Sequence, residues 1–146
     1  MDFEYFFSEQ FAELCREYGL KTEKWGSREY ALVGHNFVLL FVGELTENME
    51  LAYIRRDLHQ NLKIWNVDWY IGTAVSDQDR TSLVPQRSIL DGWKNDVTIV
   101  AHLLKRCFHN LLSGGDDWME DYFNSEYAFP PRDVIGFYRE QAEKYI

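Results

Sequence analysis

The sequence contains few cysteines and few prolines, and it has no long apolar run. Two cysteines and three prolines occur among 146 residues. Cys15 and Cys107 both fall on or near apolar faces of expected helices, which favours buried thiols over a disulfide. The longest strongly apolar run, residues 37–42, is far shorter than the roughly 20 residues that span a bilayer. We therefore expect neither a disulfide nor a transmembrane helix.

Targeting signals are also missing from the sequence. The first residues lack the basic region of a secretory signal, and neither end carries a lipidation pattern. A cytoplasmic protein that does not bind membranes is the simplest interpretation.

Positive charge is scarce, since 15 Lys and Arg face 24 Asp and Glu, and the net charge is −9. The acidity lies at the two ends: the net charge is −6 for residues 1–50, +2 for 51–112 and −5 for 113–146. A surface that binds nucleic acid directly needs a dense patch of Lys and Arg, which this chain does not offer. A basic protein partner is more compatible with this charge distribution.

Motifs for catalysis, metal binding and phosphate binding are absent from the sequence. There is no His-Glu-x-x-His, Cys-x-x-Cys or Gly-x-Ser-x-Gly pattern. His102 and His109 would be about 10 Å apart along a helix, too far to share one metal ion. Gly114 and Gly115 precede two aspartates, whose charge would repel a phosphate. We expect no catalytic residue, no metal and no cofactor from these patterns.

What the chain does contain is apolar and aromatic residues, at 46% and 16%. Together with the length, this composition predicts a single globular domain over residues 1–146. Apolar residues at helical spacing predict a helix over residues 2–18, with Asp2 as its N-cap and Gly19 as its stop.

A change to a period of two then predicts four strands joined by short connections. They are residues 30–33, 37–42, 49–55 and 62–75. In the last strand Trp65 and Trp69 share one face and are expected in the core. Short connections between neighbours favour an antiparallel meander.

The remainder predicts a long polar loop over 76–88, a helical turn over 89–93 and a helix that has Asp96 as its N-cap and ends at the Gly114-Gly115 pair. A short helix from Asp116 to about Glu126 and a last helix over 131–145 follow. The fold class is therefore α+β, with an N-terminal helix, a four-stranded antiparallel sheet and two to three C-terminal helices packed on it. The helices can cover both sheet faces, or one face can be left to a partner.

The most unusual stretch is residues 113–129, called the acidic-aromatic segment below. It contains five acidic residues, no basic residue and five aromatic residues. The acids are Asp116, Asp117, Glu120, Asp121 and Glu126, and the rings are Trp118, Tyr122, Phe123, Tyr127 and Phe129. Carboxylates attract a basic partner over a distance, and rings anchor it after contact.

The exposure of these rings cannot be derived from their spacing alone. If Met119 and Phe123 face the core, Trp118 and Tyr122 are displaced by about 100° and half exposed. The alternative is that all four are buried and the segment is a charged helix over a core.

Three hypotheses follow. The first is a non-enzymatic protein-binding domain that uses Asp116, Asp117, Trp118, Glu120, Asp121 and Tyr122. In size, acidity and mixed architecture the chain is similar in general character to bacterial immunity proteins and inhibitors, which implies a basic partner such as a toxic enzyme.

The second hypothesis is a small-molecule-binding or enzymatic domain with a pocket on the sheet. Its candidate residues are Arg55, Asn66, Asp68 and Tyr70, with Asp68 as a possible base. A deep pocket containing Asp68 would favour it. The third hypothesis is a structural subunit that forms a homodimer through an apolar sheet face.

Overall fold

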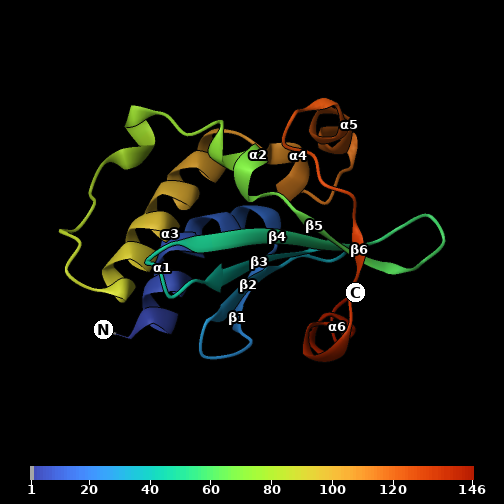
Figure 1. Cartoon of the computed structure of the whole chain (residues 1–146), viewed down its shortest axis with the longest axis horizontal. Helices are drawn as coiled ribbons and strands as arrows, with labels where there is room; N and C mark the ends of the chain where they lie inside the picture. The colour runs from blue at the N-terminus through green and yellow to red at the C-terminus, as the bar shows by residue number, and fades with distance from the viewer. Residues whose placement is uncertain (1) are drawn as a thin grey trace.

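The computed structural model describes residues 2–146 and shows one antiparallel sheet with helices on both faces (Figure 1). The strands follow one another across the sheet in chain order: β1 (Lys21–Lys24), β2 (Glu29–Val33), β3 (Val38–Gly43), β4 (Met49–Arg56), β5 (Leu62–Asn66) and β6 (Arg132–Asp133). The helices are α1 (Phe3–Tyr18), α2 (Asp68–Gly72), the 3-10 helix η1 (Asp77–Arg80), α3 (Ile89–Arg106), α4 (His109–Leu112), α5 (Asp117–Asn124) and α6 (Gly136–Ala142). The α+β class, the N-terminal helix and the C-terminal helices are as predicted.

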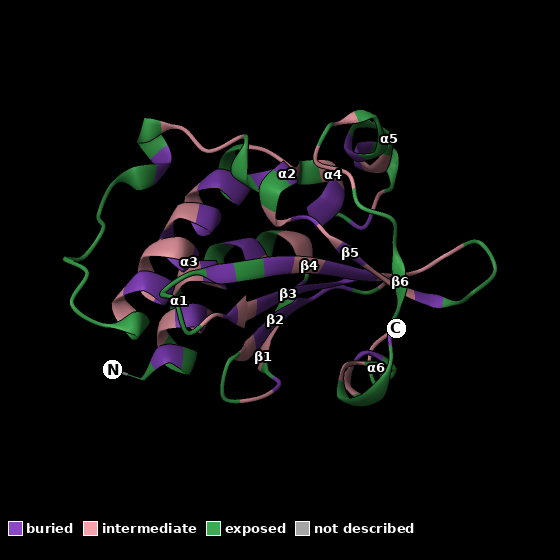
Figure 2. Cartoon of the chain, viewed as in Figure 1, coloured by how far each residue is buried: buried purple, intermediate pink, exposed green. Residues whose placement is uncertain are grey.

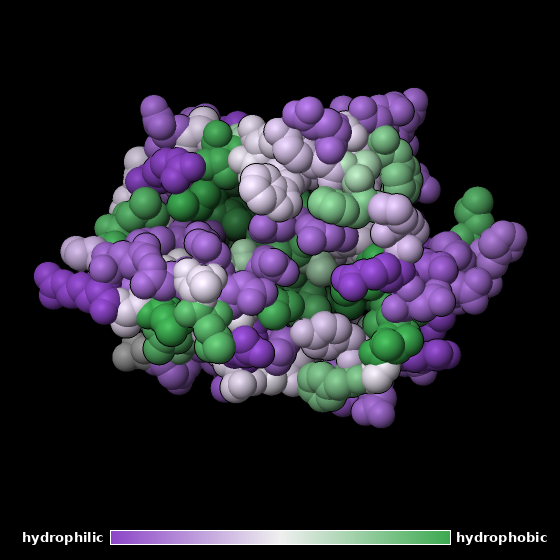
Figure 3. Space-filling view, viewed as in Figure 1, coloured by the Kyte–Doolittle hydropathy of each residue, from purple (hydrophilic) through white to green (hydrophobic). Residues whose placement is uncertain are grey.

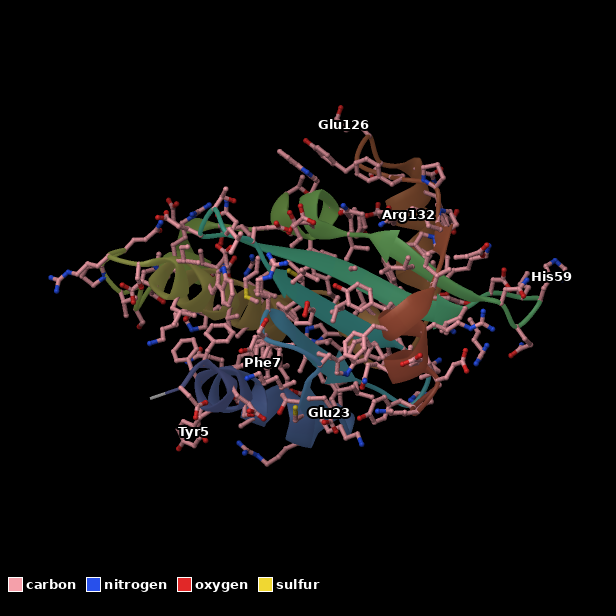
Figure 4. The ribbon with its side chains drawn as sticks, turned by 60° about the horizontal axis from the view of Figure 1, so that its bottom comes forward. Tyr5, Phe7, Glu23, His59, Glu126 and Arg132 are labelled. Carbon is pink, nitrogen blue, oxygen red and sulfur yellow. The ribbon has the colours of Figure 1, made fainter. Side chains whose placement is uncertain are left out.

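The first helix follows its sequence pattern closely. The Asp2 carboxylate accepts the N–H of Tyr5 at 2.8 Å, which satisfies one of the free donors of the first turn. Gly19 ends the helix with a φ of 67°, a left-handed conformation that favours glycine. Figure 4 shows Phe7 directed from this helix towards the sheet and Tyr5 directed away from it.

The main core lies between α1, α3 and one face of the sheet. Figure 2 shows the buried sides of both helices turned towards the strands. The largest fully buried side chains include Phe7, Phe11, Phe41 and Tyr53, which belong to one hydrophobic cluster. Removing this apolar surface from water is the main force that holds the helices on the sheet.

The second sheet face is covered by α6. Ala31, Leu40 and Ile54 form a separate cluster with Val134 and Ala142 from the C-terminal segment. This cluster explains why residues 37–42 are apolar on both alternations: each face of β3 has its own helical cover.

The strand predicted over residues 62–75 is wrong beyond Asn66. Val67, Tyr70 and Ile71 are buried, whereas Trp69 is 64% exposed. Burial at positions i, i+3 and i+4 is the helical pattern, and the chain forms α2 here. The Asn66 side chain accepts the N–H of Asp68 at 3.1 Å and so turns the chain out of the strand. The prediction of Trp69 as a core ring is therefore wrong.

Two strands were not predicted, so the sheet has six strands instead of four. Strand β1 pairs with β2 at one edge. At the other edge β6 pairs with β5, and Lys63 contacts Asp133 at 2.6 Å. This pairing uses residues 132–133, so the predicted helix over 131–145 shortens to α6.

Helix α3 begins eight residues before the predicted start. Ser88 is its N-cap, and the Ser88 hydroxyl accepts the N–H of Asp91 at 3.2 Å. Asp96, the predicted cap, lies inside the helix, and its carboxylate accepts the N–H of Met49 at 2.7 Å. The helix ends at Arg106, and Phe108 has a left-handed φ of 65° before α4 begins.

Candidate functional site

A pocket of about 690 Å³ lies between the start of β4, α2 and α3, and is called the α2–α3 pocket below. Apolar side chains make much of its wall: Phe41, Leu51, Ile71, Val75, Val100 and Leu103. Figure 3 shows a hollow on this face of the molecule with hydrophobic side chains at its bottom. The volume lies within the range of pockets that hold small organic ligands.

The break between β5 and α2 creates one side of this pocket. The pairing of Ala52 with Asn66 is the last pair of the β4–β5 ladder in this direction. If the ladder continued by two more residues, Glu50 on β4 would lie opposite Asp68. Like charges at opposite positions destabilise a ladder. The chain instead turns into α2, and both residues line the pocket.

Asp68 has the most perturbed carboxyl group of the pocket. Its pKa is raised to about 6, mainly by burial and further by the negative charges of Glu50 and Asp96. The backbone N–H of Leu51 opposes this rise. A carboxyl group with a pKa near neutrality can bind a cation or accept a proton, and such groups are common at functional sites.

Asp96 approaches the pocket from α3. Burial raises its pKa, while the hydrogen bond from the Met49 N–H and the positive charge of Arg80 act in the opposite direction. Arg80 is the single basic residue among the described residues that line the pocket.

Of the four residues predicted for a sheet pocket, the structure places Asp68 in the α2–α3 pocket and the other three elsewhere. Arg55 donates to the carbonyls of Gly114 and Gly115, each at 3.1 Å. The backbone carbonyl of Asn66 accepts the Tyr122 hydroxyl at 2.8 Å. The Tyr70 hydroxyl donates to Asp121 at 2.6 Å, and the pKa of Tyr70 is raised by burial and by this contact.

These contacts join the two predicted sites to each other. Arg55, Asn66 and Tyr70 hold the acidic-aromatic segment against the end of the sheet. Their polar groups are occupied by structural hydrogen bonds.

In the acidic-aromatic segment, Trp118 is 6% exposed and Tyr122 is 0% exposed. The Trp118 indole donates to the Gly115 carbonyl at 3.2 Å, and its ring meets Tyr53 edge-on at a centroid distance of 4.8 Å. Phe123 is 51% exposed, which is the reverse of the arrangement that would expose Trp118 and Tyr122. Trp118 and Tyr122 therefore contribute to the core of the folded protein.

The acids of the segment remain at the surface. Asp116, Asp117, Glu120 and Asp121 are all exposed, although Asp121 accepts the Tyr70 hydroxyl. The exposed face of α5 thus carries Asp117, Glu120 and the Phe123 ring, with Asp116 directly before it.

Sequence reasoning did not identify Glu50, Arg80 or Asp96 as members of a pocket. Asp96 was assigned as a helix cap, and the other two were given no role. These residues come from β4, η1 and α3, so no local spacing relates them to Asp68. The sequence signal for this site is limited to one carboxylate in an apolar stretch.

Between residues 2 and 146, no group of three or more His, Cys, Asp or Glu side chains is arranged to hold a metal ion. The two cysteines are free and half-buried. None of the helices in the described part of the chain is long and apolar enough to cross a membrane. No known protein family, curated protein or solved structure gives a significant match to the chain.

Proposed function

We propose that this protein binds a small organic ligand in the α2–α3 pocket. The observation that carries the proposal is the position of Asp68, a carboxylate with a raised pKa, in a pocket of about 690 Å³ lined by both apolar and polar side chains. A few polar groups that converge in a mostly apolar pocket are typical of ligand sites. The second hypothesis from the sequence named a pocket containing Asp68 as the observation that would favour it, but placed this pocket on the sheet with Arg55, Asn66 and Tyr70.

The unfavourable environment of the Asp68 carboxylate supports a role in binding. Placing a carboxylate in this position costs folding free energy, because burial and two nearby acids disfavour its charged form. Functional sites often contain groups that lower stability in this way.

Blocking the pocket tests the proposal. Gly72 lines the pocket, and a Cβ atom built there meets no atom within 4 Å, so a larger side chain has room. We expect Gly72→Phe to fold and to lose binding of organic fragments, as followed by chemical shifts of the backbone amides of α2 and α3. The control is Asn124→Phe at the exposed end of α5. Equal fragment binding by both variants would argue against a ligand site in this pocket.

A second candidate function is binding of a basic protein through the exposed face of α5, as expected for an immunity-type inhibitor. The observation that favours it is the grouping of Asp116, Asp117 and Glu120 beside the half-exposed Phe123 ring. In this version Phe123 replaces Trp118 and Tyr122 as the aromatic anchor. Acidic side chains would speed association by electrostatic steering.

The test for this second function uses the variant Asp116→Asn/Asp117→Asn/Glu120→Gln, which leaves the Asp121–Tyr70 hydrogen bond intact. Partners captured from the source cell by the unmodified protein should associate more slowly with the variant and with a weaker dependence on salt. The control is Glu9→Gln/Glu13→Gln on the exposed side of α1. An unchanged association rate would exclude the α5 face from the interface.

A further inference from the structure

The charged groups of the α2–α3 pocket are strongly unbalanced in sign. Among the described residues that line it, Glu44, Glu50, Asp68 and Asp96 are acidic, and Arg80 alone is basic. The four acids come from four places: the β3–β4 turn, β4, α2 and α3. Their charge therefore converges on one cavity through the fold.

No compensating base is bound to these carboxylates. In residues 2–146, none of the four acids has a Lys, Arg or His nitrogen within 4.0 Å. The buried carboxylate of Asp79, by contrast, forms an ion pair with Arg106 at 2.5 Å. The carboxylates of the pocket are left without an equivalent partner within the chain.

The remaining surface of the pocket is unsuited to a bare metal ion. Apolar side chains make much of its wall, and the described acids do not form a metal-binding group. Hard cations require several oxygen ligands around one small volume. A pocket of about 690 Å³ lined by carboxylates and by apolar side chains is complementary to an organic cation with an apolar body.

Trp69 adds an aromatic surface of the appropriate kind. It lines the same pocket, is 64% exposed and follows Asp68 directly in α2. An ammonium or guanidinium group is attracted to the face of an indole ring as well as to a carboxylate. The same pocket thus offers a cation two kinds of favourable contact.

Building on the proposed function, we infer that the ligand of the α2–α3 pocket is a small organic amine or guanidine. Its cationic group lies by Asp68, Glu50 and Asp96, and its apolar part contacts Ile71, Val100 and Leu103. Neutral and anionic molecules of the same shape lose the charge contacts and bind more weakly.

The experiment compares three probes of similar size: phenethylamine, 2-phenylethanol and 3-phenylpropionate. Affinities are measured at pH 7.5 from backbone amide shifts. We expect the amine to bind about tenfold more tightly than the alcohol, and the propionate to bind most weakly. Asp68→Asn and the exposed Glu50→Gln should each weaken amine binding several-fold and leave alcohol binding unchanged. Asp116→Asn, outside the pocket, should change neither affinity.

The outcomes separate this inference from the proposed function. Equal binding of amine and alcohol, abolished by Gly72→Phe, would overturn the cation preference and leave a ligand pocket. Failure of all three probes to shift any pocket amide at millimolar concentration would count against both. Amine binding that Asp116→Asn weakens and Asp68→Asn does not would place the cation site on α5 and overturn the inference.

Discussion

Arg106 donates two hydrogen bonds to Asp79, from Nη2 at 2.5 Å and from Nε at 3.3 Å. The Asp79 side chain is buried, and Arg106 also donates to the carbonyl of Ala74 at 2.8 Å. These contacts fasten η1 and the end of α2 to the C-terminal end of α3. Figure 1 shows the long segment between α2 and α3 running outside α3, so this ion pair is its anchor near the pocket.

Loss of Arg106 should therefore destabilise the protein. Arg106→Met leaves the Asp79 carboxylate buried without its partner, which costs more than an exposed ion pair contributes. We expect the Tm to fall by about 5 °C or more. The control is Lys105→Met, which removes the exposed ion pair with Glu13 at 3.0 Å and should change the Tm by much less. A similar fall in Tm for the two variants would show that the Arg106–Asp79 ion pair stabilises the fold no more than the exposed Lys105–Glu13 pair.

Asp68→Asn should raise stability at neutral pH. The pKa of Asp68 is about 6 in the folded protein, above its ordinary value of 3.8. The folded state therefore holds the proton more tightly than the unfolded state, and stability falls as the pH rises from about 4 to 6. At pH 7.5 the neutral amide removes this cost, about 1 kcal/mol after allowance for solvent screening.

The same comparison at pH 4 provides the check. There the folded carboxyl group is protonated, so Asp68→Asn should have the stability of the unmodified protein in urea unfolding. An equal gain in unfolding free energy at pH 7.5 and pH 4 would show that the charge of Asp68 is not the cause.

Amine binding should weaken in acid. As the pH falls through about 6, Asp68 takes up a proton and loses the charge that attracts the amine. Linkage of one proton predicts a several-fold loss of phenethylamine affinity from pH 7.5 to pH 5, comparable to the loss expected for Asp68→Asn. Glu50 on β4, Asp96 on α3 and Arg80 on η1 face the same space, and the raised pKa of Asp96 adds to the effect in the same direction. Asp68→Asn should show a flatter pH profile by titration calorimetry.

Tyr122→Phe should destabilise the protein by about 1–3 kcal/mol. The Tyr122 hydroxyl donates to the Asn66 carbonyl at 2.8 Å and accepts the Phe129 N–H at 2.9 Å. Removing it leaves both backbone groups without this partner next to the fully buried Tyr122 ring. Chemical denaturation measures the loss, and Tyr5→Phe on the exposed side of α1 is the matched control with little expected effect. A neutral result for Tyr122→Phe would mean that water replaces the hydroxyl.

Elements whose pattern is local were predictable from the sequence. The cap at Asp2, the left-handed Gly19 and the apolar stripe of α1 are set by residues within one or two turns of each other. The same holds for β2, β3 and β4, whose tight turns leave few alternatives to antiparallel pairing. The hairpin between β4 and β5, with His59 at its tip in Figure 4, also follows from a polar run between two apolar strands.

The region from Leu62 to Gly72 shows where local pattern was insufficient. Trp65, Val67, Trp69 and Ile71 alternate as in a strand, while Val67, Tyr70 and Ile71 also fit one side of a helix. Contacts distant in the chain decide between them: Val67 donates to the Leu51 carbonyl at 3.2 Å, and Tyr70 reaches Asp121. Propensity is a weak preference that such packing overrides.

From the sequence alone follow the α+β class, the first helix, the central strands and the concentration of acid at the two ends, because each depends on neighbouring residues or on composition. The burial of Trp118 and Tyr122 and the pocket around Asp68 were decided by the tertiary structure. Both depend on residues that are far apart in the chain and meet only after the helices pack on the sheet. The α2–α3 pocket exists because β5 stops at Asn66 and α3 carries Asp96 to the same place.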